Sequence, residues 1–232
     1  MIFVRILFLI SLAQLSACAS HTSDVNSKQL KPMQTLSEKF LLKRNPKNHT
    51  ISLLKDNNPS LLLYKKTTNS QTLEEVAVSF LQRHRKDFLI KNPAAEFKTL
   101  SNKTDDLGFT RIKLAQVYQG IPVWNGIISA HFNRQGELQI VRGEYFPTPD
   151  NIDIKAGMSS DALFQTMSAI DPNITNKNYK LAKIIYPLTE TTPRLAYELQ
   201  PVGHAKLASY TYIIDAMTGD ILNRQSNIQT LR

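Results

Sequence analysis

Histidine and cysteine, which often bind transition metals or take part in nucleophilic catalysis, are few in this sequence of 232 residues. A zinc hydrolase needs two histidines one helical turn apart with a glutamate between them, and a common serine hydrolase needs a Gly-x-Ser-x-Gly turn. Neither pattern occurs here. The histidines are His21, His49, His84, His131 and His204, and the single cysteine is Cys18. Because no two histidines are close along the chain, we expect no catalytic residues, no metal site and no cofactor.

The cysteine stands where it is more suited to modification than to catalysis. The apolar run Ile6 to Ala13 follows the basic Arg5, which is typical of a signal peptide and too short to span a bilayer. Leu15 to Cys18 resembles the bacterial lipobox, whose cysteine is diacylated and becomes the first residue of the mature protein. The alternative is an ordinary signal peptide cut at the A-x-A-like site "ACAS", with a free thiol left over.

Both alternatives predict an exported protein, and a chain with one cysteine forms no internal disulfide bond. With residues 1–17 as a lipoprotein signal peptide, we expect a lipid-anchored protein of the bacterial cell envelope. Ala19 after the cysteine favours the outer membrane, with the protein facing the periplasm. Residues 18–39 are polar, poor in aromatics and typical of a flexible tether.

The formal net charge of the chain is +9. Its basic residues are scattered and form no arginine-rich or glycine-aromatic motif, so we expect no nucleic-acid partner. A basic surface of this kind favours attraction to anionic lipid head groups or to an acidic partner, and it names no specific ligand.

Hydrophobic patterning predicts an α+β fold of two small domains, each an antiparallel sheet packed against a helix. The first domain is placed at residues 40–147. It begins with a short hairpin of residues 50–54 and 60–65, and continues with a helix over 72–90, in which Thr72 and Glu75 have the spacing of a capping box. After a loop over 91–108 we expect strands over 109–118, 123–132 and 138–145.

The second domain is placed at residues 154–226. A polar connection containing a proline, residues 148–153, precedes it and is expected to be accessible to proteases. A helix over 158–170 with Ser159 or Ser160 as its cap comes next. Strands over 179–188 and 194–202 and a final hairpin over 208–225 complete the domain. Residues 227–232 form a tail.

Residues 117–126, "VYQGIPVWNG", join two predicted strands. Gly120 can take a positive φ, and Pro122 fixes its own φ while withholding one hydrogen-bond donor from the sheet. The positions assigned mainly to turn chemistry, here and elsewhere, are Gly120, Pro122, Gly126, Gly136, Asp215 and Gly219.

The helix and three strands of the first domain resemble the fungalysin/thermolysin propeptide (FTP) domain, which precedes secreted zinc metalloproteases. That family shows a helix with a Phe-Leu pair, then an arginine-led strand ending in Gln-x-Tyr-x-Gly-x-Pro-Val, a second strand, a glycine turn and a third strand. The matching positions are Phe80, Leu81, Arg111, Gln116, Tyr118, Gly120, Pro122, Val123, Gly126, Gly136 and Gly143.

The hairpin from Tyr212 to Leu222, with Asp-Ala-Met-Thr-Gly at its turn, resembles the last hairpin of a PepSY domain. An FTP domain followed by a PepSY domain is the arrangement of thermolysin-type (M4 family) precursors, and the sequence ends about where those precursors pass into the enzyme. The resemblance implies a non-catalytic, free-standing propeptide that binds and inhibits a thermolysin-like zinc metalloprotease, or assists its folding. Two alternatives stay open: a lipid-anchored envelope module with no protease partner, and the remnant of a truncated precursor.

The residues predicted to contact the partner come from the first domain and the tail. In the domain they are Arg111, Gln116, Tyr118 and Trp124. The alternative for Arg111 and Gln116 is a solvated face or a buried hydrogen bond, and for Tyr118 a core position. In the tail they are Asn227, Ile228, Leu231 and Arg232. An extended tail would enter the protease cleft as an added strand, with Ile228 and Leu231 in a pocket and the carboxylate of Arg232 near the zinc of the partner.

Overall fold

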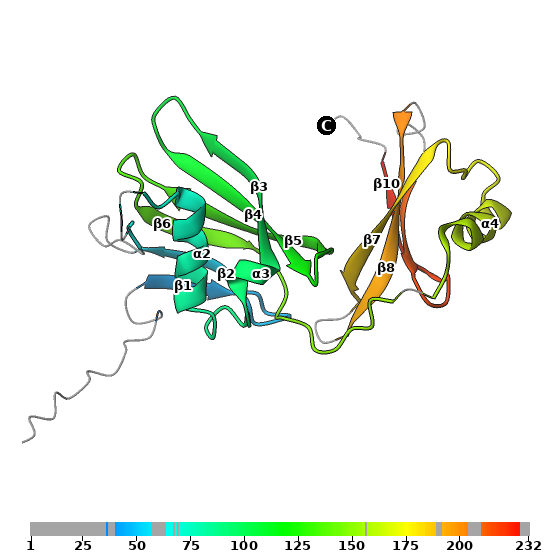
Figure 1. Ribbon diagram of the computed structural model, residues 1–232, viewed down its shortest axis with the longest axis horizontal. Helices are drawn as coiled ribbons and strands as arrows, with labels where there is room; N and C mark the ends of the chain where they lie inside the picture. The colour runs from blue at the N-terminus through cyan, green and yellow to red at the C-terminus, as the bar shows by residue number, and fades with distance from the viewer. Residues whose placement is uncertain are drawn as a thin grey trace, which may run out of the picture. The chain divides into compact units, whose positions relative to one another are not determined.

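The computed structural model describes residues 36, 40–56, 64–66, 68, 70–155, 157–188, 192–203 and 210–227. The predicted signal peptide, Cys18, most of the predicted tether, and Ile228, Leu231 and Arg232 lie outside these residues. The described part is a mixed α+β fold, mostly sheet with few helices and two-domain-like (Figure 1). None of its helices combines the length and the apolar character that crossing a membrane requires. The predicted domain boundaries stay a prediction.

Six strands form an antiparallel N-terminal sheet with the order β1-β2-β6-β5-β4-β3. The strands are β1 (Phe40–Arg44), β2 (Ile51–Asp56), β3 (Phe97–Thr104), β4 (Thr110–Tyr118), β5 (Ile121–Phe132) and β6 (Leu138–Glu144). Two helices accompany them, α2 (Leu73–Arg83) and the short α3 (Pro93–Glu96).

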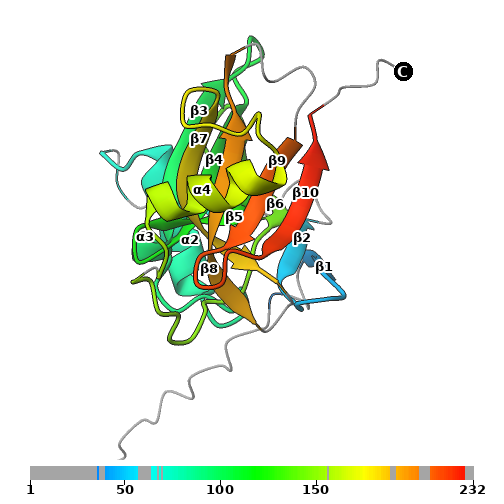
Figure 2. The same ribbon diagram turned by 90° about the vertical axis from the view of Figure 1, so that its right-hand side faces the viewer.

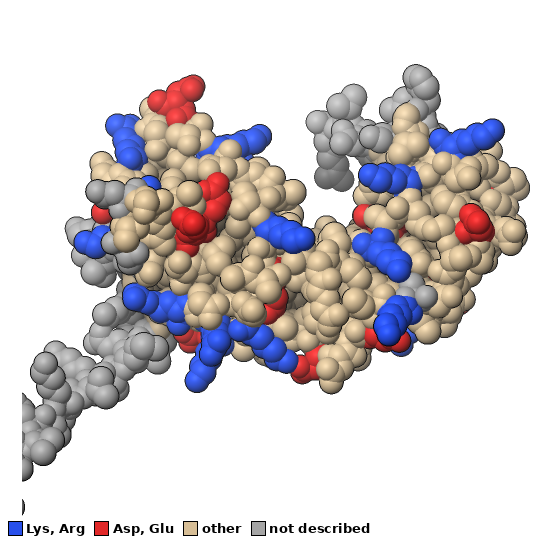
Figure 3. Space-filling view, viewed as in Figure 1, with Lys and Arg blue, Asp and Glu red and all other residues tan. Residues whose placement is uncertain are grey.

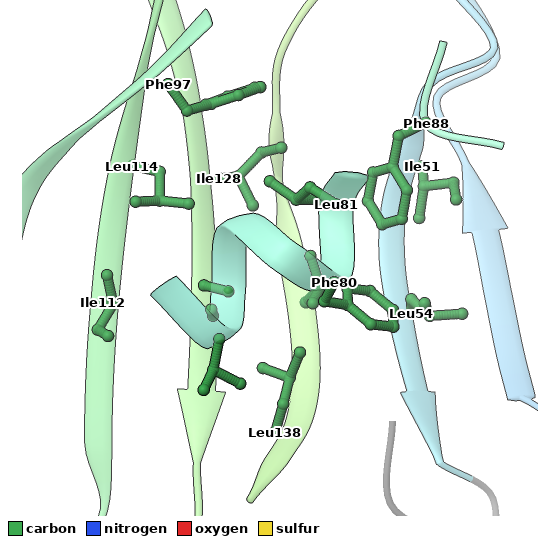
Figure 4. Close-up of a cluster of buried hydrophobic side chains, with 14 of the residues drawn as sticks. Ile51, Leu54, Phe80, Leu81, Phe88, Phe97, Ile112, Leu114, Ile128 and Leu138 are labelled. Atoms are coloured by element: carbon green, nitrogen blue, oxygen red, sulfur yellow. The ribbon is translucent and has the colours of Figure 1, made fainter. Parts of the chain in front are cut away.

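Helix α2 forms where the sequence supplies both a cap and an apolar stripe. The Thr72 hydroxyl accepts the amide of Glu75, and the Glu75 carboxylate accepts the amide of Thr72, so the predicted capping box is present. Val76, Ala77, Phe80 and Leu81 are all buried on one side of the helix. Figure 4 shows Phe80 and Leu81 pointing between Ile51, Leu54, Ile128 and Leu138 of the strands beneath. The helix ends at Arg83, earlier than the predicted residue 90.

Two sequence-based predictions for this half are wrong. The partner of β2 in the first hairpin is β1 and not residues 60–65: Leu42 pairs with Leu54, and the other edge of β2 is occupied by β6. The predicted loop over 91–108 contains α3 and the eight-residue strand β3. Phe97 is the only fully buried residue of β3, so its side chains show no alternation that would reveal a strand.

The C-terminal sheet is antiparallel, with the order β7-β8-β9-β10. Its elements are α4 (Ser160–Ile170), β7 (Tyr179–Pro187), β8 (Pro193–Pro201), β9 (Tyr210–Asp215) and β10 (Ile221–Ser226). Ser159 caps α4 by accepting the amide of Ala162, and the buried Leu163 and Met167 pack in one cluster with Ile185, Leu199 and Ile214. Figure 2 shows α4 lying across these strands. One parallel pair, Val123 with Ile185, joins β5 to β7.

Candidate functional site

The β4–β5 connection is a tight turn followed by a break in the ladder. Gln119 and Gly120 both have positive φ, 48° and 85°, as a two-residue hairpin turn requires. Pro122 already lies in β5, opposite Val117. The next paired residue of β5 on this ladder is Ile127, opposite Ala115. Residues 123–126 therefore bulge out of the β4–β5 ladder, and Gln116 is the unpaired residue on the β4 side.

Gln116, which lies opposite the bulge, forms side-chain hydrogen bonds with the chain just after β6. Its side chain is almost fully buried, its Nε2 donates to the Phe146 carbonyl at 2.8 Å, and its Oε1 accepts the Phe146 amide at 3.0 Å. A Cβ atom at Gly126 would lie 2.8 Å from Cβ of Gln116 and 3.0 Å from its Oε1. Gly126 is therefore required for space beside this amide and does not form a turn, which corrects its predicted role.

Residues 145–152, here called the connection segment, are bonded to the N-terminal half at several further points. The Thr148 amide donates to the Leu89 carbonyl at 3.0 Å. The Thr148 hydroxyl accepts the Lys91 amide at 2.8 Å and donates to Glu96 at 2.6 Å. Lys91 also forms an ion pair with Asp150. Thr148 is thus fixed through both its backbone and its side chain.

The two ends of the connection segment are fixed as well. Tyr145 is buried, its hydroxyl accepts the Ile51 amide at 3.0 Å, and its carbonyl accepts Nδ2 of Asn48 at 2.9 Å. Burial raises the pKa of Tyr145 far above its ordinary value, so the ring stays neutral. At the other end the Tyr118 hydroxyl accepts the Ile152 amide at 3.3 Å. The predicted polar connection is therefore an ordered part of the fold.

The bulge also places Trp124 against the C-terminal sheet. Its ring meets the ring of Tyr186 edge to face, with centroids 5.1 Å apart. Trp124, Tyr186 and Leu222 cover a cluster of Ile184, Ala196 and Ile213 on the face of β7, β8 and β9 away from α4. The tryptophan is half-buried in this contact. Its predicted role as a partner contact stays a prediction.

Arg111 lies on the face of the N-terminal sheet opposite α2. Cross-strand pairing aligns Arg111 with His131 and Ile140, and Lys113 with Ser129 and Arg142. The alternating residues between them, such as Ile112 and Ile128, are buried beneath α2. We call the set Lys103, Arg111, Lys113, His131 and Arg142 the basic face. Elsewhere the cationic side chains are spread over both halves, as Figure 3 shows from one side.

Two open depressions lie on the basic face and share Arg111. One, of about 680 Å³, is bordered by Lys103, Asp105, His131 and Gln139, and the other, of about 540 Å³, by Lys113, Ser129, Arg142 and Glu144. Nε2 of His131 is buried and has no hydrogen-bond partner among the described residues. Burial lowers the pKa of His131, and the charges of Arg142 and Arg111 lower it further.

The remaining predicted site residues have structural contacts. Gly136 and Gly219 have positive φ, 73° and 79°. The Asp215 carboxylate accepts the amides of Met217 and Thr218 within the β9–β10 turn. The Asn227 side chain accepts the Thr211 hydroxyl at 3.2 Å. Among the described residues, no group of three histidine, cysteine or acidic side chains is arranged to hold a metal ion.

Glu96, Thr148, His131 and Arg142 were not among the residues predicted from the sequence. Polar residues at alternate positions of strands β4 and β5 were a usable signal for the basic face, because such residues share one side of a sheet. No local signal marked the Glu96–Thr148 contact, which joins residues 52 positions apart.

Comparison with known proteins places the described N-terminal sheet in context. Residues 95–145 match the family described as Fungalysin/Thermolysin Propeptide Motif. The match begins within α3 and ends at Tyr145, so it contains β3 to β6, the bulge and the whole basic face. The predicted resemblance to FTP propeptides is confirmed over this range.

Three relatives extend the match. The chain is 32% identical over 166 residues to the thermolysin of Alicyclobacillus acidocaldarius subsp. acidocaldarius, which covers 65% of this chain and 29% of the relative. It is 30% identical over 177 residues to the thermostable neutral protease NprT of Geobacillus stearothermophilus, covering 69% and 31%. It is 28% identical over 166 residues to the bacillolysin of Bacillus caldolyticus, covering 65% and 29%. The chain thus spans less than a third of these relatives, and the similarity covers the propeptide region of thermolysin and not its catalytic domain.

A solved structure also aligns with the chain. The Bacillus megaterium YpeB C-terminal domain is 15% identical, and the alignment covers 82% of this chain and 83% of that one with a TM-score of 0.37. A TM-score this low supports no argument about fold or function. The PepSY resemblance of the second half stays a prediction.

Proposed function

We propose that this protein acts as a free-standing propeptide: it binds a thermolysin-like zinc metalloprotease, inhibits it, and assists its folding. The observation that carries the proposal is the FTP match over residues 95–145, together with a similarity to thermolysins that is confined to their propeptide region. The chain itself contributes no catalytic group in this proposal.

Inhibition would come from the C-terminal tail. Strand β10 is the edge strand of its sheet and ends at Ser226, so the chain leaves the fold at the sheet edge. Asn227 is still held by Thr211, and the tail proper begins after it. We expect residues 228–232 to bind along the protease cleft as an added strand. The structured halves would hold the tail there by docking on the protease surface.

The structure changes how this should be tested. Residues 223–226 form most of β10 and pair with β9. A deletion from Asn223 would therefore damage the sheet, whereas removal of residues 228–232 leaves β10 complete.

The test compares the full chain carrying Cys18→Ser with the same chain lacking residues 228–232. The longer protein should inhibit a thermolysin-like protease of the same organism at least about tenfold more strongly than it inhibits a serine protease. The deletion should weaken inhibition by at least about tenfold and leave the unfolding midpoint unchanged. Absence of binding, inhibition and assisted refolding against all such proteases of the organism would favour the envelope module or the remnant.

Lipid anchoring is a separate part of the proposal. We infer that the mature protein begins at Cys18, carries acyl chains there and is held at the bacterial outer membrane. The support is the lipobox-like segment ending at Cys18. Mass spectrometry of the N-terminal peptide should find acyl chains on this cysteine, and Cys18→Ser should move the protein to the soluble fraction. Unmodified wild-type protein in the periplasm or medium would refute the anchor without affecting the proposed protease binding.

A further inference from the structure

We propose that the basic face of the N-terminal sheet is a docking surface for the aspartate and glutamate side chains of an acidic protein surface. The proposal rests on the proposed function, in which that surface belongs to the partner protease. It adds two statements: which part of the chain first contacts the protease, and which side chains of the protease that part recognises.

The arrangement of the cations supports this surface. Neighbouring strands in a sheet lie about 5 Å apart, and alternate residues along a strand lie about 7 Å apart. Arg111 and Lys113 are alternate residues of β4. Arg142 of β6 lies in the same cross-strand row as Lys113, with Ser129 of β5 between them. Lys103 stands opposite Arg111 on β3. The positive groups thus lie one or two strands, or two residues, from their nearest neighbours on one face of the sheet.

No ion pair among the described residues neutralises this array. The ion pairs among the described residues are His84–Asp87, Lys91–Asp150 and Arg194–Asp215, and none involves the basic face. Like charges on neighbouring strands destabilise a sheet. The buried Nε2 of His131, which has no partner among the described residues, carries a further cost. Carboxylates of a partner would relieve the repulsion and give His131 an acceptor.

The border of the face favours a protein over a lipid surface. Asp105 borders one depression and Glu144 the other. A uniformly anionic lipid surface would repel both carboxylates, whereas a protein surface can offer each of them a cation or an amide. Ser129 and Gln139 add neutral hydrogen-bonding groups between the charges. The surrounding strands β4, β5 and β6 also lie within the segment shared with protease propeptides.

The experiment compares two triple variants. One removes three positive charges from the basic face, and the other removes three positive charges from elsewhere in the chain. The face variant is Arg111→Ala, Lys113→Ala, Arg142→Ala in the full chain with Cys18→Ser. The control is Lys177→Ala, Lys180→Ala, Lys183→Ala, which alters exposed lysines in or just before β7 and changes the net charge equally. Association with the protease is followed by stopped-flow fluorescence between about 50 mM and about 300 mM salt.

We expect the face variant to associate about tenfold more slowly at low salt and to lose most of the salt dependence, with less than about a twofold change in the control. Equal effects of both variants, or none, would overturn the docking surface and leave the proposed function intact. If the face variant lost binding to phosphatidylglycerol vesicles but not to the protease, the surface would be a lipid site and the proposal wrong. A wild-type chain that bound no such protease would overturn both proposals.

A pH series with His131 gives an independent readout. Arg111 on β4, Arg142 on β6 and Lys103 on β3 line the face around it, with Asp105 at the border. In the free protein the pKa of His131 is lowered by burial and by Arg142 and Arg111. Bound carboxylates would raise it, so the wild-type affinity should rise severalfold as the pH falls from about 7.5 to about 5.5. His131→Gln should remove this rise; an unchanged rise in the variant would exclude His131 from the surface.

Discussion

Helices α2 and α4 are each 11 residues long, begin at a side-chain cap and cover one face of an antiparallel sheet. The opposite faces of the two sheets differ. On the N-terminal sheet that face exposes Arg111 and Arg142 to solvent. On the C-terminal sheet it contains Ile213, 1% exposed, in a cluster that Trp124 helps to cover.

The comparison shows that the same arrangement, a helix on one face of an antiparallel sheet, can have its second face either open or covered. A sheet with a helix on one side can leave its second face to solvent if that face is polar, and must cover the face if it is apolar. The covered face contributes to the stability of the chain, whereas the open cationic face places like charges on neighbouring strands. The second face of the N-terminal sheet is therefore the one suited to a partner.

A matched pair of substitutions tests most directly whether the second faces of the two sheets contribute differently to stability. Ile213→Ala should lower the free energy of unfolding by about 3 kcal/mol, because it leaves a cavity in a covered cluster. Ile127→Ala, on the open face, should lower it by about 1 kcal/mol or less, because Ile127 is only partly buried. Urea unfolding of the two variants measures both values. Equal losses would mean that the two second faces do not differ in the way described.

Substitution of Trp124 tests whether its ring stabilises the second face of the C-terminal sheet by covering it. Trp124→Ala should destabilise the protein by about 2 kcal/mol through loss of its packing on Tyr186 and the cluster below. The rate of association with a protease should change little. Tyr186→Phe is the control, since it keeps the ring and loses only the hydrogen bond from Asn223. Unchanged stability combined with a loss of affinity would instead make the tryptophan a partner contact.

Gln116 tests how the N-terminal half holds the connection segment. Gln116→Leu removes both hydrogen bonds to Phe146 and should cost about 1–2 kcal/mol. Hydrogen exchange at the Phe146 amide should accelerate more than exchange in β6. The exposed Gln200 on β8 offers a control, and Gln200→Leu should change stability by less than about 0.5 kcal/mol. Unaltered exchange at Phe146 would show that Gln116 is dispensable there.

As the pH falls, each half of the chain should lose a small amount of stability, and the two losses should occur in different pH ranges. Burial lowers the pKa of His84 and of His131, so the unfolded chain takes up protons first and stability is lost as the pH falls through about 6.5. Burial alone would raise the pKa of Asp215, but the Met217 amide, Arg194 and the Thr218 amide lower it overall. Its contribution is present above its ordinary pKa of about 4 and lost as the pH falls below it.

The measurement is the unfolding free energy from about pH 8 to about pH 3, in wild type and two variants. His131→Gln should flatten the decline near neutral pH, and Asp215→Asn the decline at acid pH, each by about 1 kcal/mol or less. A variant that leaves its own range unchanged would contradict the assigned cause.

The helices were predictable because their signals are local. Thr72 with Glu75 and Ser159 with an amphipathic run each specify a helix start within a few residues. Strands β4, β5 and β6 were predictable from apolar alternation beneath α2. Strand β3 was not, because backbone pairing with β4 holds it while its side chains stay mostly exposed. Arg111 was predicted as a partner contact, which stays a prediction. Its neighbours on the basic face, His131 and Arg142, could not be predicted because they depend on strand register, which the sequence pattern left open.

The hydrogen bonds along the connection segment also constrain how its length can change in evolution. Phe146, Thr148, Asp150 and Ile152 each meet a fixed partner at alternate positions. One inserted or deleted residue would move every later member of the series out of reach of its partner. Substitutions that keep the spacing would be tolerated far better than a change in residue count. Among related chains, length differences should therefore gather at sites such as the turn after β3 and be absent between Phe146 and Ile152.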